Sequence, residues 1–327
     1  MIITILLNGV GGPTPRSIAK SLLRYSDLDV HIIGTDSNPH AHGLYEDDLY
    51  EKTYLIPCCD DPDYWPFINE IVELHQIDLA IVQPEQEVIE WTRRKSLGLD
   101  WPCKALLPDF DLVRCLINKS RMTEILKGTE FVPHSYTINP DCLDIHAIEK
   151  NLEYPFWIRS TVGSSGLGSL KIRNQMGLIN WITMNPDVSQ FIGSEFLPGR
   201  NLACKLLFYK GELLRAACAE RVHYIMSKVA PSGITGNTSF GRLLNEPDLI
   251  DFCESALRII EKQTRKPAES VPQLLVHAFR CFSRQTAAGQ LLIYLESPYG
   301  TSANGHFRDA VRPAGSPAAS AVRLQGL

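Results

Sequence analysis

Short apolar runs alternate with helical patterns over the first 110 residues of this 327-residue chain. Continuous apolar runs are typical of parallel strands that are buried on both faces. The segments between them carry apolar residues at helical spacing, as at Ile18, Leu22 and Leu23. This alternation predicts a doubly wound α/β domain. The expected strands are residues 2–7, 30–34, 77–82 and 105–108.

The turn after the first strand is rich in glycine but is not a dinucleotide fingerprint. Residues 8–15 read Asn-Gly-Val-Gly-Gly-Pro-Thr-Pro, and the second strand ends at Thr35-Asp36. This order is the first half of a Rossmann-like unit. Because the turn lacks the G-x-G-x-x-G spacing, a nicotinamide cofactor is disfavoured. Glycines that serve only helix–strand packing are the alternative.

Two acidic residues, Glu85 and Glu87, follow the third expected strand in the sequence Gln-Pro-Glu-Gln-Glu. They would lie outside the carboxyl end of a parallel strand, which is where α/β sheets bind ligands. Solvated loop acids are the alternative, and the sequence leaves both interpretations open.

A glycine–serine stretch divides two further strands within residues 154–172. Its glycines remove side chains, so that backbone N–H groups can close on an anion, and its serines add hydroxyl donors. Arg159, on the incoming strand, is a cation that could meet the same anion. The stretch predicts either a phosphate-binding hairpin or a plain flexible turn. The loop residues concerned are Gly163, Ser164, Ser165, Gly166 and Gly168.

Residues 191–262 have the character of an α+β region. An apolar strand ends at Glu195, before a Pro-Gly turn, and a strand–turn–strand hairpin occupies residues 202–219. Arg215 lies on the second strand of this hairpin and Arg221 just past its end. The fold class expected for the chain is therefore α/β followed by α+β.

The overall composition excludes several classes of protein. A net charge of −5 gives no reason to expect nucleic acid or an anionic membrane as a partner. The nine cysteines are scattered without C-x-x-C spacing, which predicts reduced thiols rather than disulfides or a zinc site. No apolar run approaches the ~20 residues of a membrane span, and the N-terminus predicts a first strand rather than a signal peptide. We expect a cytoplasmic protein.

Taken in order, these motifs resemble the ATP-grasp superfamily, in its branch similar to the carbamoyl-phosphate-synthase large subunit and biotin carboxylase. The resemblance rests on Asn118-Lys119, the glycine hairpin, the Glu-Phe-Leu-Pro-Gly-Arg-Asn segment at 195–201 and Glu220-Arg221 with the glycine loop that follows it. It implies a Rossmann-like pre-ATP-grasp domain at 1–110, a lid subdomain at 111–190 and a C-terminal ATP-grasp subdomain at 191–268.

The resemblance also implies a nucleotide site with ATP and Mg²⁺ as cofactors. Lys119 would enter it from a linker, Arg159 would pair with phosphate oxygens, and the glycine loop would close over the β- and γ-phosphates. The segment 195–201 would form the adenine end, with Glu195, Phe196 and Leu197 near the ring and Asn201 facing the ribose. Arg215 and Arg221 are implied as catalytic cations for the transferred phosphoryl group or an acyl phosphate.

ATP-grasp enzymes activate a carboxylate by γ-phosphoryl transfer and let an amine or similar nucleophile displace phosphate. The resemblance therefore implies an ATP-dependent ligase whose partners are a small-molecule carboxylate and a nucleophile, with residues 8–15 and 85–87 shaping the acceptor pocket. An inactive ATP-binding homologue and a Rossmann-type NAD(P)-dependent enzyme are the alternatives. A homodimer is an open alternative to a monomer.

The last sixty residues depart from this pattern. The resemblance calls for acidic residues on two strands to hold Mg²⁺, but residues 270–295 contain no Asp or Glu. Glu296 is the one candidate metal ligand, and Pro298 stands where a liganding Asn is expected. We therefore expect an atypical or truncated C-terminal part, with residues 269–327 as a divergent tail. Such a tail would be genuine, in a degenerate ATP-grasp member that binds nucleotide weakly or without catalysis, or it would be the product of a frame disruption or truncation near residue 268.

Overall fold

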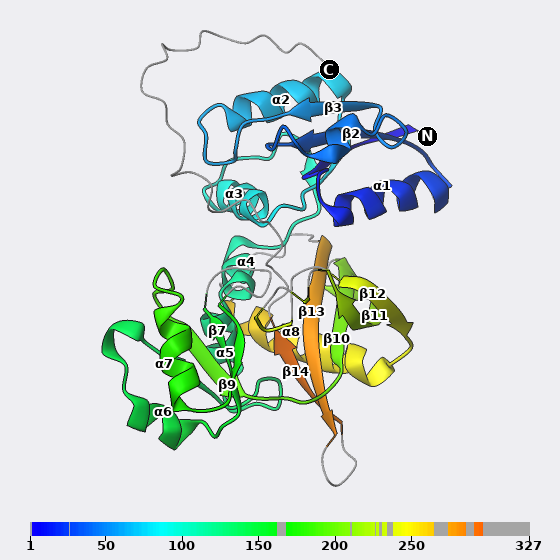
Figure 1. The fold of residues 1–327 in the computed structure, drawn as a ribbon. Helices are drawn as coiled ribbons and strands as arrows, with labels where there is room; N and C mark the ends of the chain where they lie inside the picture. Colours follow the sequence, from blue (N-terminus) through cyan, green and yellow to red (C-terminus); the bar gives the residue numbers. More distant parts are fainter. Residues whose placement is uncertain are drawn as a thin grey trace, which may run out of the picture. The chain divides into compact units, whose positions relative to one another are not determined.

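In the computed structural model the chain forms two compact units, Met1–Phe110 and Asp111–Ala303, and each has its own sheets (Figure 1). The structure describes residues 2–25, 27–161, 168–209, 211–225, 227–228, 231–233, 238–264, 274–285 and 291–296. No helix in these ranges is long and apolar enough to cross a membrane.

The Met1–Phe110 unit is built on a five-stranded parallel sheet with the strand order β3-β2-β1-β4-β5. Helices α1 and α2 lie on opposite faces of this sheet (Figure 1), which confirms the predicted doubly wound architecture. The strands are β1 (Ile2–Asn8), β2 (Asp29–Asp36), β3 (Lys52–Leu55), β4 (Leu79–Ile81) and β5 (Lys104–Ala105). The helices are α1 (Pro13–Tyr25), α2 (Tyr64–His75), α3 (Glu85–Ser96) and the 3-10 helix η1 (His42–Tyr45).

Strand β3 was not predicted from the sequence. It is four residues long and forms one edge of the sheet, and Tyr54 is its only buried residue. A strand with a single buried side chain has no continuous apolar run, so the pattern that identifies central parallel strands is missing.

The direction of the strand order reverses between β1 and β4. The loops that follow these two strands approach each other closely at this point. Gly9 has a φ of +73°, and a Cβ placed on it would lie 2.6 Å from Cγ of Pro84, so a larger residue would collide with the neighbouring loop. Such a reversal creates the crevice in which open α/β sheets bind ligands.

The Asp111–Ala303 unit contains a four-stranded antiparallel sheet with the order β6-β9-β7-β8. Phe156, Ile158 and Phe191 form its core together with Leu178 and Trp181. The elements are β6 (Ser135–Ile138), η2 (Pro140–Cys142), α6 (Ile145–Asn151), β7 (Phe156–Ser160), β8 (Leu170–Ile172), α7 (Gln175–Thr183) and β9 (Phe191–Glu195).

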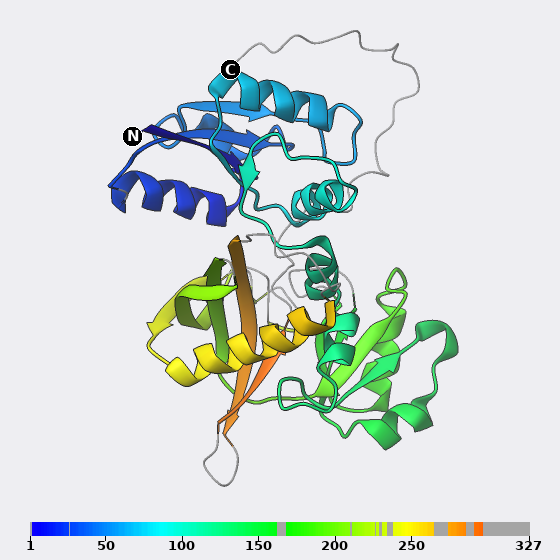
Figure 2. The same ribbon diagram turned by 180° about the vertical axis from the view of Figure 1, so that it is seen from behind.

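A second antiparallel sheet in this unit has the order β12-β11-β10-β13-β14. Helix α8 lies across it (Figure 2), and α4 and α5 complete the core through Leu116 and Met122, which pack with Leu206 and Leu257. The elements are α4 (Phe110–Ile117), α5 (Lys119–Ile125), β10 (Asn201–Tyr209), β11 (Glu212–Tyr224), β12 (Thr238–Leu244), α8 (Pro247–Thr264), β13 (Leu274–Gln285) and β14 (Leu291–Glu296).

Strands β13 and β14 fall in the part of the chain for which the sequence predicts a divergent tail, either frame-shifted or disordered. The backbone of β13 pairs with β10, from Asn201 opposite Phe282 to Tyr209 opposite Leu274, and β14 pairs with β13. Within residues 274–296, the structure therefore has two strands, β13 and β14. Residues 297–327 lie outside the described ranges.

Candidate functional site

The segment predicted to contact adenine connects the two antiparallel sheets of the Asp111–Ala303 unit. Strand β9 of the four-stranded sheet ends at Glu195, and β10 of the five-stranded sheet begins at Asn201. Glu195 N donates a hydrogen bond to His134 O at 3.0 Å, and Gly199 N donates to Leu197 O at 3.0 Å, which closes the intervening turn. Glu195, Phe196 and Leu197 are all half-buried. We call residues 195–201 the hinge segment.

Two side chains that the sequence did not single out contact the hinge segment. Lys171 of β8 places its Nζ 3.5 Å from the centroid of the Phe196 ring, which is a cation–π contact. Arg200 forms ion pairs with Glu246 (3.0 Å) and with Glu220 (3.4 Å). The ion pairs join the hinge segment to β11 and to the residue before α8, so neighbouring strands and a helix fix its position.

Asn201, the predicted ribose contact, is half-buried at the start of β10. Its Oδ1 atom is buried and has no hydrogen-bond partner among the residues that the structure describes. A buried acceptor without a donor is costly, and a ligand hydroxyl would satisfy it.

The strand before the glycine loop carries Arg159, which is half-buried on β7 opposite Ile192 of β9. Gly168, at the end of the loop, has a φ of +67°, and its carbonyl oxygen accepts a hydrogen bond from Trp181 Nε1 at 3.0 Å. This bond attaches the end of the loop to α7. The other predicted loop residues, Gly163, Ser164, Ser165 and Gly166, lie outside the described residues.

The two predicted catalytic arginines lie on one strand but not together. Arg221 is half-buried on β11, and its Nε donates to Thr238 Oγ1 of β12 at 2.6 Å. Arg215, on the same strand, is exposed and donates to the Leu214 carbonyl oxygen at 2.7 Å. Six residues of extended strand separate the two arginines by about 20 Å. Pairing of Leu202 with Glu220 places Arg221, rather than Arg215, beside the hinge segment.

Lys119 and Glu296, the remaining predicted site residues, are described by the position of their backbone. Lys119 is the first residue of α5, directly after Asn118, whose side chain caps the helix by accepting from Arg121 N at 2.9 Å. Glu296 is the last residue of β14 and pairs with Arg280 of β13. Within the described residues, no group of three or more His, Cys, Asp or Glu residues could hold a metal ion.

A buried polar network crosses the carboxyl edge of the parallel sheet in the Met1–Phe110 unit. Glu87 Oε2 accepts hydrogen bonds from Asn8 Nδ2 and from the Tyr64 hydroxyl, both at 2.5 Å. The Tyr64 hydroxyl in turn accepts from Trp91 Nε1 at 2.8 Å. Burial raises the pKa of Glu87 to about 7, although the hydrogen bonds from Tyr64 and Asn8 lower it.

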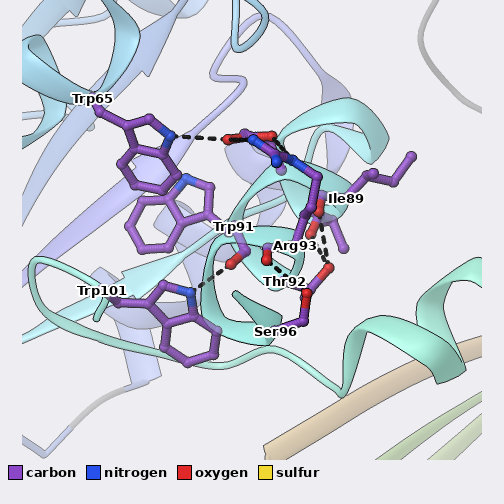
Figure 3. A network of polar contacts seen from close by, with 9 residues as sticks. Trp65, Ile89, Trp91, Thr92, Arg93, Ser96 and Trp101 are labelled. Atoms are coloured by element: carbon purple, nitrogen blue, oxygen red, sulfur yellow. Dashed lines mark hydrogen bonds and ion pairs between the residues drawn. The ribbon is translucent and has the colours of Figure 1, made fainter. Parts of the chain in front are cut away.

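Aromatic packing holds this network in place. The ring centroid of Trp91 lies 5.3 Å from that of Trp65 and 6.3 Å from that of Trp101, and Figure 3 shows the three indoles side by side. Trp65 Nε1 donates to Glu90 Oε1 at 3.0 Å, and Trp101 Nε1 donates to the Trp91 carbonyl oxygen at 2.7 Å. These contacts fix α3, and with it Glu87 in the first turn of that helix.

Solved structures share this fold. N5-carboxyaminoimidazole synthetase from Staphylococcus aureus, in complex with ADP, matches with a TM-score of 0.61 at 16% sequence identity. The match covers 93% of this chain and 72% of the synthetase chain. D-alanine–D-alanine ligase from Bacillus anthracis has a TM-score of 0.54 at 12% identity, covering 91% and 86%. A D-Ala:D-Ser ligase from Enterococcus faecalis has a TM-score of 0.56 at 14% identity, covering 91% and 90%.

The chain therefore has the fold of the ATP-grasp enzymes, as the sequence resemblance predicts. The likeness does not single out the carbamoyl-phosphate-synthase-like branch. No family model and no curated protein matches the sequence.

Proposed function

We propose that the protein is an ATP-dependent ligase of the ATP-grasp type, which activates a carboxylate as an acyl phosphate for attack by an amine or a similar nucleophile. The observation that carries the proposal is the likeness of fold to ligases over more than nine-tenths of the chain, including a structure in complex with ADP. The substrates would be a small-molecule carboxylate and a nucleophile. A cytoplasmic location and a homodimer remain predictions.

The hinge segment is the proposed adenine and ribose site. Phe196 and Leu197 offer backbone groups to the adenine ring, and the buried Oδ1 of Asn201 is suited to accept from a ribose hydroxyl. Arg159 on β7 and Lys119 at the start of α5 are the proposed cations for the phosphates of ATP. Charge-assisted hydrogen bonds of this kind position the phosphates and neutralise the charge that develops during phosphoryl transfer.

Arg221 is the stronger candidate for the transferred phosphoryl group, because its strand position lies beside the hinge segment. Arg215 was predicted for the same role, but its position about 20 Å along β11 suits it less well. In the proposed reaction an oxygen of the substrate carboxylate attacks the γ-phosphorus, ADP leaves, and the amine then displaces phosphate from the acyl carbon. The protein contributes orientation and charge neutralisation.

The family resemblance also implies Mg²⁺, with acidic ligands expected on two strands near the end of the chain. Among the residues that the structure describes, no group of three or more His, Cys, Asp or Glu could hold a metal ion, and the sequence of β13 has no acidic residue. Glu296, at the end of β14, remains the one predicted ligand from this pair of strands. No step of the proposed reaction is assigned to a metal here.

The proposal is tested by ADP release from the purified chain, with ATP and a panel of carboxylates and amines. We expect release that depends on one carboxylate and increases with one amine. If ATP raises the melting temperature but no combination releases ADP, the protein is an ATP-binding homologue without ligase activity. If NAD(P) rather than ATP raises the melting temperature, the ATP-grasp proposal itself is wrong.

A further inference from the structure

We propose that the carboxyl edge of the parallel sheet in the Met1–Phe110 unit binds the primary ammonium group of a small molecule, through Glu87 and Asn8. The assignment of this molecule as the amine acceptor rests on the proposed ligase function. The binding of an ammonium group is argued from the Met1–Phe110 unit alone.

One polar group from each of four successive strands converges at this edge. Asn8 and Asp36 are the last residues of β1 and β2, Cys59 follows β3, and Glu87 follows β4. Asn8 contacts Glu87 directly. The charge of Asp36 acts on Glu87, and the charge of Glu87 acts on Cys59. The convergence lies at the reversal of strand order between β1 and β4, where such sheets bind ligands.

The polar groups that meet at this edge of the sheet are mostly hydrogen-bond acceptors. Both oxygens of Asp36 accept from backbone, Oδ2 from Gly11 N at 2.9 Å and Oδ1 from Asn38 N at 2.8 Å. The groups that act on Glu87 are Tyr64, Asn8 and Asp36, and none of them is a cation. A carboxylate that has a second carboxylate, and no cation, among the described groups acting on it attracts a positively charged ligand and repels phosphates and carboxylates.

Asn8 gives an independent indication of a ligand. Its side chain is fully buried, its Nδ2 is bound to Glu87, and its Oδ1 has no hydrogen-bond partner among the described residues. A buried acceptor is normally satisfied. An ammonium group has three donors and no acceptor, so one such group placed against Glu87 could donate to its carboxylate and to Asn8 Oδ1.

A purely structural role explains this arrangement less well. Tyr64 and Trp91 could be held by a neutral glutamine at position 87, since its carbonyl oxygen would accept the same hydroxyl hydrogen bond. The chain instead buries a carboxylate, which is 7% exposed, where ionisation is opposed by desolvation and by Asp36. A ligand cation would remove that penalty.

The test is the binding of amines in the absence of nucleotide. The twenty amino acids and their N-acetyl derivatives are compared by calorimetry, because acetylation removes the ammonium charge and leaves the side chain unchanged. We expect at least one amino acid to bind, its N-acetyl form to bind at least tenfold more weakly, and Glu87→Gln to weaken binding at least tenfold. Glu73→Gln, an exposed change on α2, is the matched control and should bind like the wild type.

Asn8→Ala provides a second variant, since it removes the free acceptor and leaves the Glu87 carboxylate. Its affinity should also fall, with circular dichroism confirming the fold of each variant. The proposal is overturned if no amino acid binds, if the N-acetyl forms bind equally well, or if Glu87→Gln binds like the wild type. Amine binding without ADP release would contradict the proposed ligase function and support the ammonium site. ADP release without amine binding in the absence of nucleotide would support the ligase function and contradict the ammonium site.

Discussion

Glu87 illustrates how one side chain acquires its properties from residues distant in the sequence. Its carboxylate is hydrogen-bonded to Asn8 and Tyr64, and burial raises its pKa to about 7 from an ordinary value of 4.5. The folded protein therefore retains a proton on Glu87 between these two pH values, where the unfolded chain has lost it. The contribution of Glu87 to stability is fully present below pH 4.5 and is lost as the pH rises through about 7.

Glu87→Gln should remove this pH dependence, because an amide does not titrate. Between about pH 5 and about pH 8, the free energy of unfolding of the wild type should fall by about 2 kcal/mol relative to the variant. Tyr64 and Cys59, the neighbouring titratable groups of α2 and the preceding loop, have raised pKa values and stay protonated over this range. Urea denaturation of both proteins at the two pH values measures the difference. A parallel change in wild type and variant would contradict a raised pKa for Glu87.

Arg159→Ala should weaken ATP binding about tenfold or more, since charge-assisted hydrogen bonds contribute about 1.5–3 kcal/mol each. Arg173→Ala is the matched control, because Arg173 is exposed and follows β8 of the same sheet. Calorimetric titration with ATP compares the two. Equal affinities would remove Arg159 from the nucleotide site.

At the scale of elements, helix α5 shows how a cap can position a residue that is proposed to bind phosphate. Asn118 satisfies Arg121 N and so fixes the first turn, of which Lys119 is part. The helical region is broken at Asn118, which separates the two helices α4 and α5. The break is explained because the side chain of Asn118 starts a new helix.

Asn118→Ala should lower the free energy of unfolding by about 1 kcal/mol and also weaken ATP binding, because Lys119 loses its fixed position. Asn174 is the matched control, since it caps α7 in the same way by accepting from Gly177 N at 2.9 Å. Asn174→Ala should lower stability by a similar amount with little effect on ATP affinity. An equal loss of affinity in both variants would show a general effect of stability and not a role of Lys119.

At the scale of the whole molecule, the two units are assigned different ligands. The proposed ammonium site belongs to the Met1–Phe110 unit, and the proposed nucleotide site belongs to the Asp111–Ala303 unit. Each proposed site uses residues of its own unit, so each ligand would have its own set of direct contacts.

Hydrogen–deuterium exchange should separate these contacts. ATP should increase protection of the hinge segment and β7, whereas a bound amine should increase protection of residues 8–12 and 84–88, which form the two loops at the reversal of the sheet. If NAD(P) protects residues 8–12 from exchange and ATP does not protect the hinge segment, a Rossmann-type dehydrogenase would be favoured.

The sequence alone determined those features that depend on local pattern. Apolar runs predicted the central parallel strands, because strands buried on both faces must be apolar along their whole length. The order of the motifs predicted the ATP-grasp fold, and the resemblance implied that residues 195–201 form the adenine end of the nucleotide site. Glu87 was a candidate because it follows a parallel strand, and Asn8 was a candidate because the resemblance implied an acceptor pocket that includes residues 8–15.

Only the tertiary structure decided which of these residues meet. It joined Tyr64 and Trp91 to Glu87, and Lys171 to Phe196, because contacts between distant segments leave no local periodicity in the sequence. It separated Arg215 from Arg221 through the register of β10 and β11, which is set by pairing between strands and not by either strand alone. It also placed β3 at a sheet edge, where one buried residue is enough to hold a strand that the sequence pattern does not reveal.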